Sequence, residues 1–148
     1  MLELIRVYRR SLSVGASLAA IMGATLVMAP QASAAQYGCP GIQVGNGEQV
    51  VERNSGYAMS TIPVFYDAAT GTNCVVNRRT MLGGSGTKAW ITVSVWADGG
   101  SPITDAGNFA TQAGPVKIKA PGKCINVKAT THKSNGDYGD LQFRGYCG

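Results

Sequence analysis

The sequence predicts an all-β protein: a small antiparallel β-sandwich or barrel of about seven or eight strands with two disulfides, preceded by a signal peptide. Short runs in which apolar and polar residues alternate follow one another along the chain, and glycine-rich clusters separate them. No stretch after the first 34 residues has a convincing helical period. The four cysteines all lie after that point, and an even count in an exported chain is typical of disulfides.

Residues 1–34 have the three parts of a secretory signal peptide. An arginine-containing start is followed by an uncharged apolar run, and Ala32 and Ala34 fit the small-residue pattern before a signal-peptidase cut. A membrane anchor is the alternative, and Arg9-Arg10 leaves twin-arginine export open as a second route. Cleavage after Ala34 leaves residues 35–148 as a single secreted β-domain, so we expect an extracellular protein that is not held by a membrane.

The runs that predict strands are, in chain order, EQVVE, IPVFYDA, CVVNRRT, ITVSVWA, PVKIKA, CINVKA and DLQFRGY. The first three are enriched in β-branched or aromatic residues, and the last four alternate. In the fourth run, Ile91, Val93 and Val95 face one side and the residues between them face the other. One apolar and one polar face suit antiparallel sheets better than parallel ones. Residues 101–114 have little periodicity, so we expect a long connection there. Pro121-Gly122 predicts a tight type II turn.

The cysteines are Cys39, Cys74, Cys124 and Cys147. Their spacing is unlike a zinc site, because there is no CxxC pair and the chain has one histidine. Four cysteines allow three pairings. We favour Cys39 with Cys74 and Cys124 with Cys147, because each such bridge ties a chain terminus to a nearby strand. The two crossed pairings stay open.

Three lysines are the candidate binding residues. Lys117 and Lys119 alternate with apolar residues in one predicted strand, and Lys128 lies in the next. If these strands are neighbours, the lysines form one positive patch that suits anionic polymers of the cell wall or spore surface. The alternative is that the lysines only protect an edge strand from pairing with other chains.

The charge of the whole mature chain is too low for a dedicated nucleic-acid binder. It has ten Lys and Arg against seven Asp and Glu, a net charge of +3. We therefore expect no nucleic-acid partner.

Five short motifs in a fixed order resemble the spore-associated protein A family of secreted actinomycete proteins. They are Cys39, Asn73 to Val76, Ala113 to Val116, Gly122 to Ile125, and the final Cys147-Gly148. Each motif is weak by itself, but their order and spacing are fairly specific and span nearly all the mature chain. The resemblance implies an exported protein found with spores or cell surfaces, and it implies no reaction.

Residues that suggest catalysis or metal binding are sparse. His132 is the only histidine, and the chain has no G-x-S-x-G nucleophile motif. Asn135, Asp137 and Asp140 would give at most a weak calcium site, and a plain turn is the alternative. We therefore predict no catalytic residue, no metal and no cofactor.

Four aromatic residues have two possible roles. Trp90, Trp96, Tyr57 and Tyr66 either anchor the core or stack against a glycan, and the sequence does not separate these roles. We predict a secreted non-enzymatic protein of the spore or cell surface. The alternative is a secreted inhibitor or small toxin-like binding protein that uses residues 101–114 as a protruding loop.

Overall fold

A computed structural model describes residues 35–45 and 47–147, so the predicted leader lies outside the described residues. Its elements are all strands. They are β1 (Ile42–Gln43), β2 (Glu48–Val51), β3 (Ala58–Ile62), β4 (Val64–Asp67), β5 (Thr72–Arg79), β6 (Ala89–Ala97), β7 (Ile103–Phe109), β8 (Gln112–Lys119), β9 (Ile125–His132) and β10 (Tyr138–Gly145). Within this part of the chain no helix is long and apolar enough to cross a membrane.

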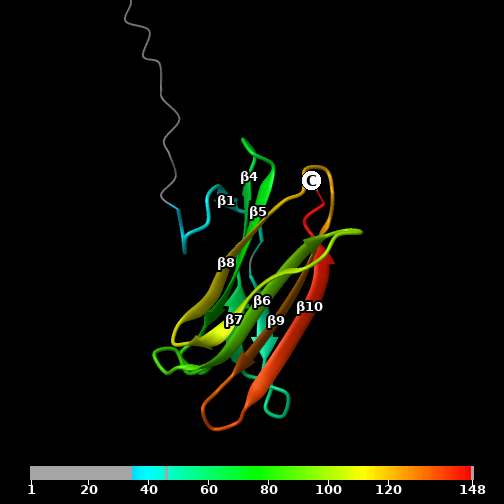
Figure 1. Cartoon of the computed structure of the whole chain (residues 1–148). Coiled ribbons are helices and arrows are strands. Elements are labelled where there is room, and N and C mark those ends of the chain that lie inside the picture. Colours follow the sequence, from blue (N-terminus) through cyan, green and yellow to red (C-terminus); the bar gives the residue numbers. More distant parts are fainter. Residues whose placement is uncertain (1–34, 46, 148) are drawn as a thin grey trace, which may run out of the picture. The chain divides into compact units, whose positions relative to one another are not determined.

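The strands form two antiparallel sheets that pack face to face (Figure 1). One sheet has the order β1-β4-β5-β3-β2, in which β4 and β3 pair with successive parts of β5, and β8 also pairs with β5. The other sheet has the order β10-β9-β6-β7. Neither sheet closes on itself, so the predicted sandwich is confirmed in place of a barrel. The described residues contain ten strands, more than the seven or eight predicted, partly because β1 is too short to show alternation and Pro63 separates β3 from β4.

The predicted long connection at residues 101–114 is wrong, because this segment forms β7 and the start of β8. β7 is an edge strand, and its inward side carries Asp105 and Gly107 between Ile103, which is 48% exposed, and Phe109, so the alternation is hidden. Asp105 faces the same side and accepts a 2.6 Å hydrogen bond from the Gly114 amide. The Phe109 ring covers Gly107, where a Cβ would lie 2.7 Å from the ring. The segment is therefore part of the sandwich and not a protruding loop.

Alternate residues of the strands fill the space between the sheets, as their alternation predicts. Ile91, Val93 and Val95 are fully buried, and Ile125 and Val127 meet them from β9. At about 25 cal/mol per Å² of apolar surface, each of these side chains stabilises the fold by about 2 kcal/mol before the cost of ordering the chain. The apolar face of each predicted run therefore becomes the core.

Buried polar side chains tie the two sheets together on the β5 side of the core. The Asn77 amide donates to the Thr92 carbonyl at 2.8 Å and to the Thr131 hydroxyl at 3.1 Å. The Ser60 and Thr131 hydroxyls share a 2.8 Å bond. A buried polar group without a partner is costly, so these bonds fix how the sheets face each other.

Arg79 extends this polar cluster and is 4% exposed. Its guanidinium donates only to main-chain carbonyls, and burial lowers the pKa of the group. The acceptors are Gly83 at 2.9 Å, His132 at 2.6 Å, Ala89 at 2.7 Å, and Phe109 and Trp90 at 3.3 Å. These carbonyls belong to β6, β7 and β9 of the four-stranded sheet and to the loop after β5, so one side chain of β5 ties its own sheet to the other.

Both favoured disulfides are confirmed, Cys39–Cys74 and Cys124–Cys147. The first fixes the N-terminal segment over β5, where Cys39, Phe65, Cys74 and Val76 form a small second apolar cluster. The second joins the start of β9 to the segment after β10. Each bridge ties a terminal segment to the sandwich, which is the reason that the sequence favoured these pairings.

Candidate functional site

The three candidate lysines do not form one patch. Lys117 and Lys119 are exposed on β8, which pairs with β5, whereas Lys128 is exposed on β9, which pairs with β6 and β10. The predicted turn at Pro121-Gly122 is confirmed by a φ of 67° at Gly122 and a 3.3 Å bond from the Lys123 amide to the Ala120 carbonyl. That turn leads from one sheet to the other, so the two strands it joins are not neighbours.

Lys117 and Lys119 instead have the position of edge residues. Among the described strands β8 pairs only with β5, and these lysines point away from the core on alternate positions. Charged side chains on an edge strand prevent pairing with other chains. The positions of Lys117 and Lys119 therefore agree with edge protection. Lys128 lies on the other sheet, apart from them.

The side of the four-stranded sheet that faces away from the core gathers a different set of residues, which we call the aromatic face. The strand registers place them there, because their neighbours in the sequence point inward. The aromatic face consists of Trp90, Thr92, Ser94 and Trp96 of β6; Thr104, Ala106 and Asn108 of β7; Asn126, Lys128, Thr130 and His132 of β9; and Tyr138, Asp140, Gln142 and Arg144 of β10.

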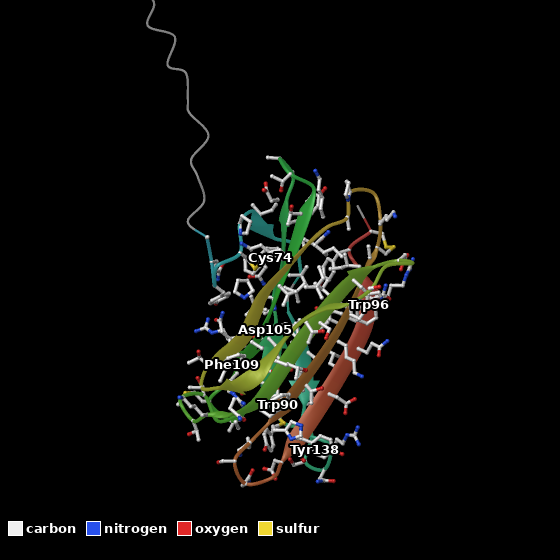
Figure 2. All side chains as sticks on the ribbon, in the orientation of Figure 1. Cys74, Trp90, Trp96, Asp105, Phe109 and Tyr138 are labelled. Carbon is white, nitrogen blue, oxygen red and sulfur yellow. A yellow bond between two sulfur atoms is a disulfide. The ribbon has the colours of Figure 1, made fainter. Side chains whose placement is uncertain are left out.

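Trp90 and Trp96 lie at opposite ends of β6 on this face (Figure 2). Trp90 is 46% exposed and Trp96 is half-buried, and neither belongs to the apolar core. The tryptophans are therefore not core anchors, and stacking against a glycan stays a prediction. Of the tyrosines, Tyr57 donates a 2.9 Å hydrogen bond to Asp137.

Short side chains occupy the middle of the aromatic face. Thr92 of β6 lies opposite Thr130 of β9 and Ala106 of β7. Ser94 lies opposite Thr104, and their hydroxyls share a 2.7 Å hydrogen bond. None of these side chains rises far above the sheet, so the surface between the tryptophans is a low floor lined with hydroxyl groups.

One ion pair lies at the Trp96 end of the face. The Arg144 guanidinium donates to both carboxylate oxygens of Asp98, and the Asn126 amide donates to Asp98 at 3.0 Å. The bond from Arg144, followed by the bond from Asn126, lowers the pKa of Asp98 to about 2. Asp98 is therefore ionised at neutral pH and neutralises Arg144.

A second ion pair lies at the Trp90 end. Arg53 pairs with Asp140 at 2.5 Å and also lies over the Tyr138 ring, 4.6 Å from its centre. The Asp140 bond raises the pKa of Arg53. The His132 ring stacks on Tyr138 with 5.3 Å between ring centres. The histidine is thus part of an aromatic stack.

The turn that suggested a weak calcium site uses its oxygens internally. Asp137 accepts hydrogen bonds from Tyr57 and Asn135, which lower the pKa of its carboxyl, and Asp140 is the partner of Arg53. Within residues 35–45 and 47–147, no group of three or more His, Cys, Asp or Glu side chains converges on a possible metal position. These hydrogen bonds are those of a plain turn, which was the alternative to a calcium site.

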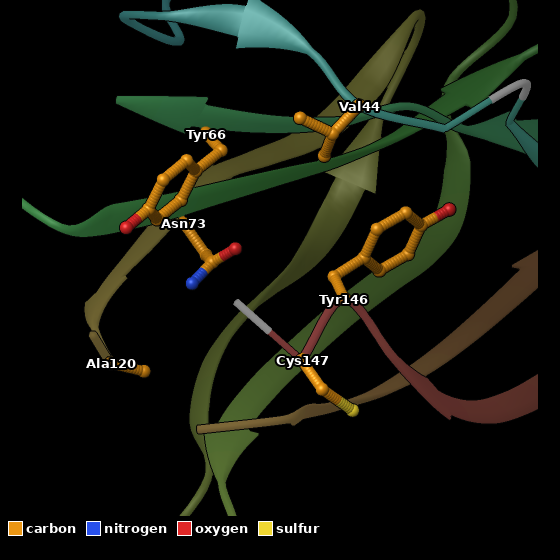
Figure 3. A pocket seen from close by; sticks show the side chains of 6 residues that line it. All are labelled: Val44, Tyr66, Asn73, Ala120, Tyr146 and Cys147. Carbon is orange, nitrogen blue, oxygen red and sulfur yellow. The ribbon is translucent and has the colours of Figure 1, made fainter. Parts of the chain in front are cut away.

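A small hollow of about 160 Å³ lies apart from the aromatic face (Figure 3). It is lined by Val44, Tyr66, Asn73, Ala120, Tyr146 and Cys147. The Tyr146 hydroxyl donates to Glu48 at 3.1 Å, and burial, followed by the charge of Glu48, raises the pKa of Tyr146 to about 12. The hollow is smaller than the usual 300–1,000 Å³ of small-molecule sites.

The fold and this surface define a class: a small disulfide-bonded β-sandwich with an open aromatic and hydroxyl-lined sheet face. The chain is 33% identical over 137 residues to spore-associated protein A of Streptomyces coelicolor, a match that covers 83% of this chain and 87% of that protein. The chain belongs to the spore-associated protein A family, as its motifs suggest. No protein-family profile matches the chain, and no solved structure matches it.

Proposed function

We propose that this chain is an exported, non-enzymatic protein that associates with the spore or cell surface through its aromatic face. Membership in the spore-associated protein A family supports the location, because the named relative is spore-associated. Two disulfides suit an oxidising, extracellular compartment. The predicted leader at residues 1–34, followed by one secreted domain, supports the same conclusion.

One observation carries the proposal of a binding role: a whole sheet face with two tryptophans is left outside the core. Large exposed aromatic residues with polar surroundings mark interaction sites more often than ordinary surface. In this protein Trp90 is 46% exposed on this face, where Arg53 is the residue from the other sheet's segments that contacts the Trp90 end, through Asp140 and Tyr138. At this position Trp90 adds nothing to the packing between the sheets, so a binding role gives a reason for it.

Binding without catalysis is supported by the environment of His132. Its ring stacks on Tyr138, and none of the described serines or carboxylates forms a hydrogen bond to the ring. A nucleophilic triad needs three convergent groups. We therefore propose attachment as the function, with no reaction.

Fractionation of the native source tests this proposal. Spores, walls, cytoplasm and culture medium are separated, and the protein is quantified in each by mass spectrometry. We expect it in the spore or wall fraction without residues 1–34. A protein that stays in the cytoplasm with its leader attached contradicts the proposal.

The inhibitor alternative was based on a protruding loop at residues 101–114, and that segment is a strand and the start of another. That reason no longer applies. A panel of secreted proteases tests the alternative directly: tight inhibition of any of them would favour it over attachment.

A further inference from the structure

We propose that the aromatic face binds an uncharged polysaccharide chain that lies along β6 from Trp90 to Trp96. This inference rests on the proposed function, since it names the ligand class for the same face. The chemistry of the face agrees with such a ligand in three respects: its aromatic ends, its floor and its charge.

The aromatic ends suit sugar rings. A pyranose ring has an apolar face of C–H groups that stacks on an indole, while its hydroxyls remain at the edges for hydrogen bonding. The two tryptophans are six positions apart along an extended strand, about 20 Å at roughly 3.3 Å per residue. That span requires a ligand with several units, so a chain fits the spacing of Trp90 and Trp96 and a single sugar does not.

The floor between the tryptophans suits a flat polymer with many hydroxyls. Thr92, Ser94, Thr104 and Thr130 each offer a group that both donates and accepts hydrogen bonds. Their shortness keeps the strip over β6 and β7 open, and the exposed Lys128 of β9, opposite Ser94, borders it. Among the described contacts only the pair Ser94 and Thr104 is already joined, so Thr92 and Thr130 remain for a ligand.

The charge of the face favours a neutral ligand. Asp98 neutralises Arg144 at one end, and Asp140 neutralises Arg53 at the other. Of the lysine and arginine side chains on the aromatic face, Lys128 is the one without an ion pair to another described residue. A single unpaired cation is too little for a nucleic acid or a polyanion, which several free cations must hold. The centre of a protein–protein interface is more apolar than this floor.

The experiment measures binding of the folded secreted domain to insoluble polysaccharides. Cellulose, chitin and starch are the neutral probes, and phosphocellulose is the anionic counterpart of cellulose. We expect binding to at least one neutral probe that is unchanged between low and high salt, because uncharged contacts are not screened. Purified spore walls should keep binding after protease, and they should lose it after periodate if the bound polymer has vicinal diols, as cellulose and starch do and chitin does not.

Variants locate the site. Trp90→Ala and Trp96→Ala should each weaken binding by about tenfold or more, as truncation of an aromatic anchor usually does. Thr92→Arg should weaken it as well by placing a long charged side chain across the floor. Met81→Ala is the matched control: it truncates a residue that is 85% exposed in the loop after β5, outside the aromatic face, and should bind as the parent does. Thermal melts confirm that each variant is folded, and Thr92→Arg keeps the test decisive if Trp96→Ala does not fold.

The outcomes separate the two proposals. If the protein is found with spores but the tryptophan and Thr92 variants bind as well as the parent, the inference is wrong and surface association stands. If neutral probes are bound through Trp90 but the protein is absent from spores and walls, the inference stands and the proposed function is wrong. Binding to phosphocellulose alone that is lost in salt, or binding to walls that protease abolishes, overturns the neutral-polysaccharide inference.

Discussion

Replacing Arg79 by Met should destabilise the sandwich more than any other single change of a charged residue that we consider. Methionine keeps much of the side-chain volume and removes the charge and all five N–H donors. The main-chain carbonyls that the guanidinium binds cannot leave, because they belong to β6, β7, β9 and the loop after β5. The substitution therefore removes one partner of a buried cluster and leaves the others.

The expected magnitude follows from the three shortest bonds, to Gly83, Ala89 and His132, which measure 2.6–2.9 Å. A buried acceptor without a donor costs about 1–3 kcal/mol, so three cost about 3–9 kcal/mol. Methionine also avoids the cost of burying a charge, several kcal/mol, which offsets part of this loss. We expect the free energy of unfolding to fall by about 3–5 kcal/mol, out of the roughly 5–15 kcal/mol typical of domains.

Denaturant titration with the disulfides intact measures the effect, with tryptophan fluorescence as the signal. Arg78→Met is the matched control, because Arg78 is the exposed neighbour on β5 and its main contact is the Tyr37 ring, 4.3 Å away. We expect that control to cost about 1 kcal/mol or less. Arg79→Lys should fall between the two, since it keeps the charge and loses the planar fork. An Arg79→Met protein within 1 kcal/mol of the parent would refute the reasoning.

Three further predictions concern the leader, a disulfide and an ion pair. N-terminal sequencing of the secreted protein should begin at Ala35 or Gln36, and a mature chain that still carries residues 1–30 would contradict export. Replacing Cys124 and Cys147 together by Ala should lower the free energy of unfolding by about 3 kcal/mol, from the loop-closure entropy of a bridge with a sequence separation of 23; an unchanged denaturation midpoint would show that the bridge adds nothing. Arg144→Met should raise the pKa of Asp98 from about 2 towards its ordinary value of 3.8, as followed by NMR titration of the carboxyl carbon. Because the folded-state pKa is depressed, the stability that this pair contributes is fully present above about pH 3.8 and is lost as the pH falls through about 2. If the pKa of Asp98 in the Arg144→Met variant stays at the parent's value, Arg144 is not the cause of the shift.

Local pattern was sufficient for most of the strands and for the core, although it missed β7, and it favoured the observed pairing of the cysteines. Alternation in the run around Ile91, Val93 and Val95 identifies the buried side without knowledge of the neighbouring strand, because side-chain direction in a strand depends only on position. Each disulfide joins a terminal segment to a strand close in sequence, so the pairing also followed from local position. The motifs at these same cysteines were enough to recognise the family.

Only the tertiary structure decided which faces lie side by side. Lys119 and Lys128 are close in sequence, yet β8 and β9 join different sheets, because a turn such as Pro121-Gly122 fits a hairpin and a crossing between sheets equally well. The same is true of Arg79, whose place in a strand does not reveal that carbonyls of β6, β7 and β9 surround it together with the nearby Gly83 carbonyl. Likewise the sequence indicates which side of β6 Trp96 faces, but only the pairing with β7 and β9 builds the hydroxyl-lined floor beside it. Strand order depends on contacts between residues far apart in sequence, and no local pattern contains it.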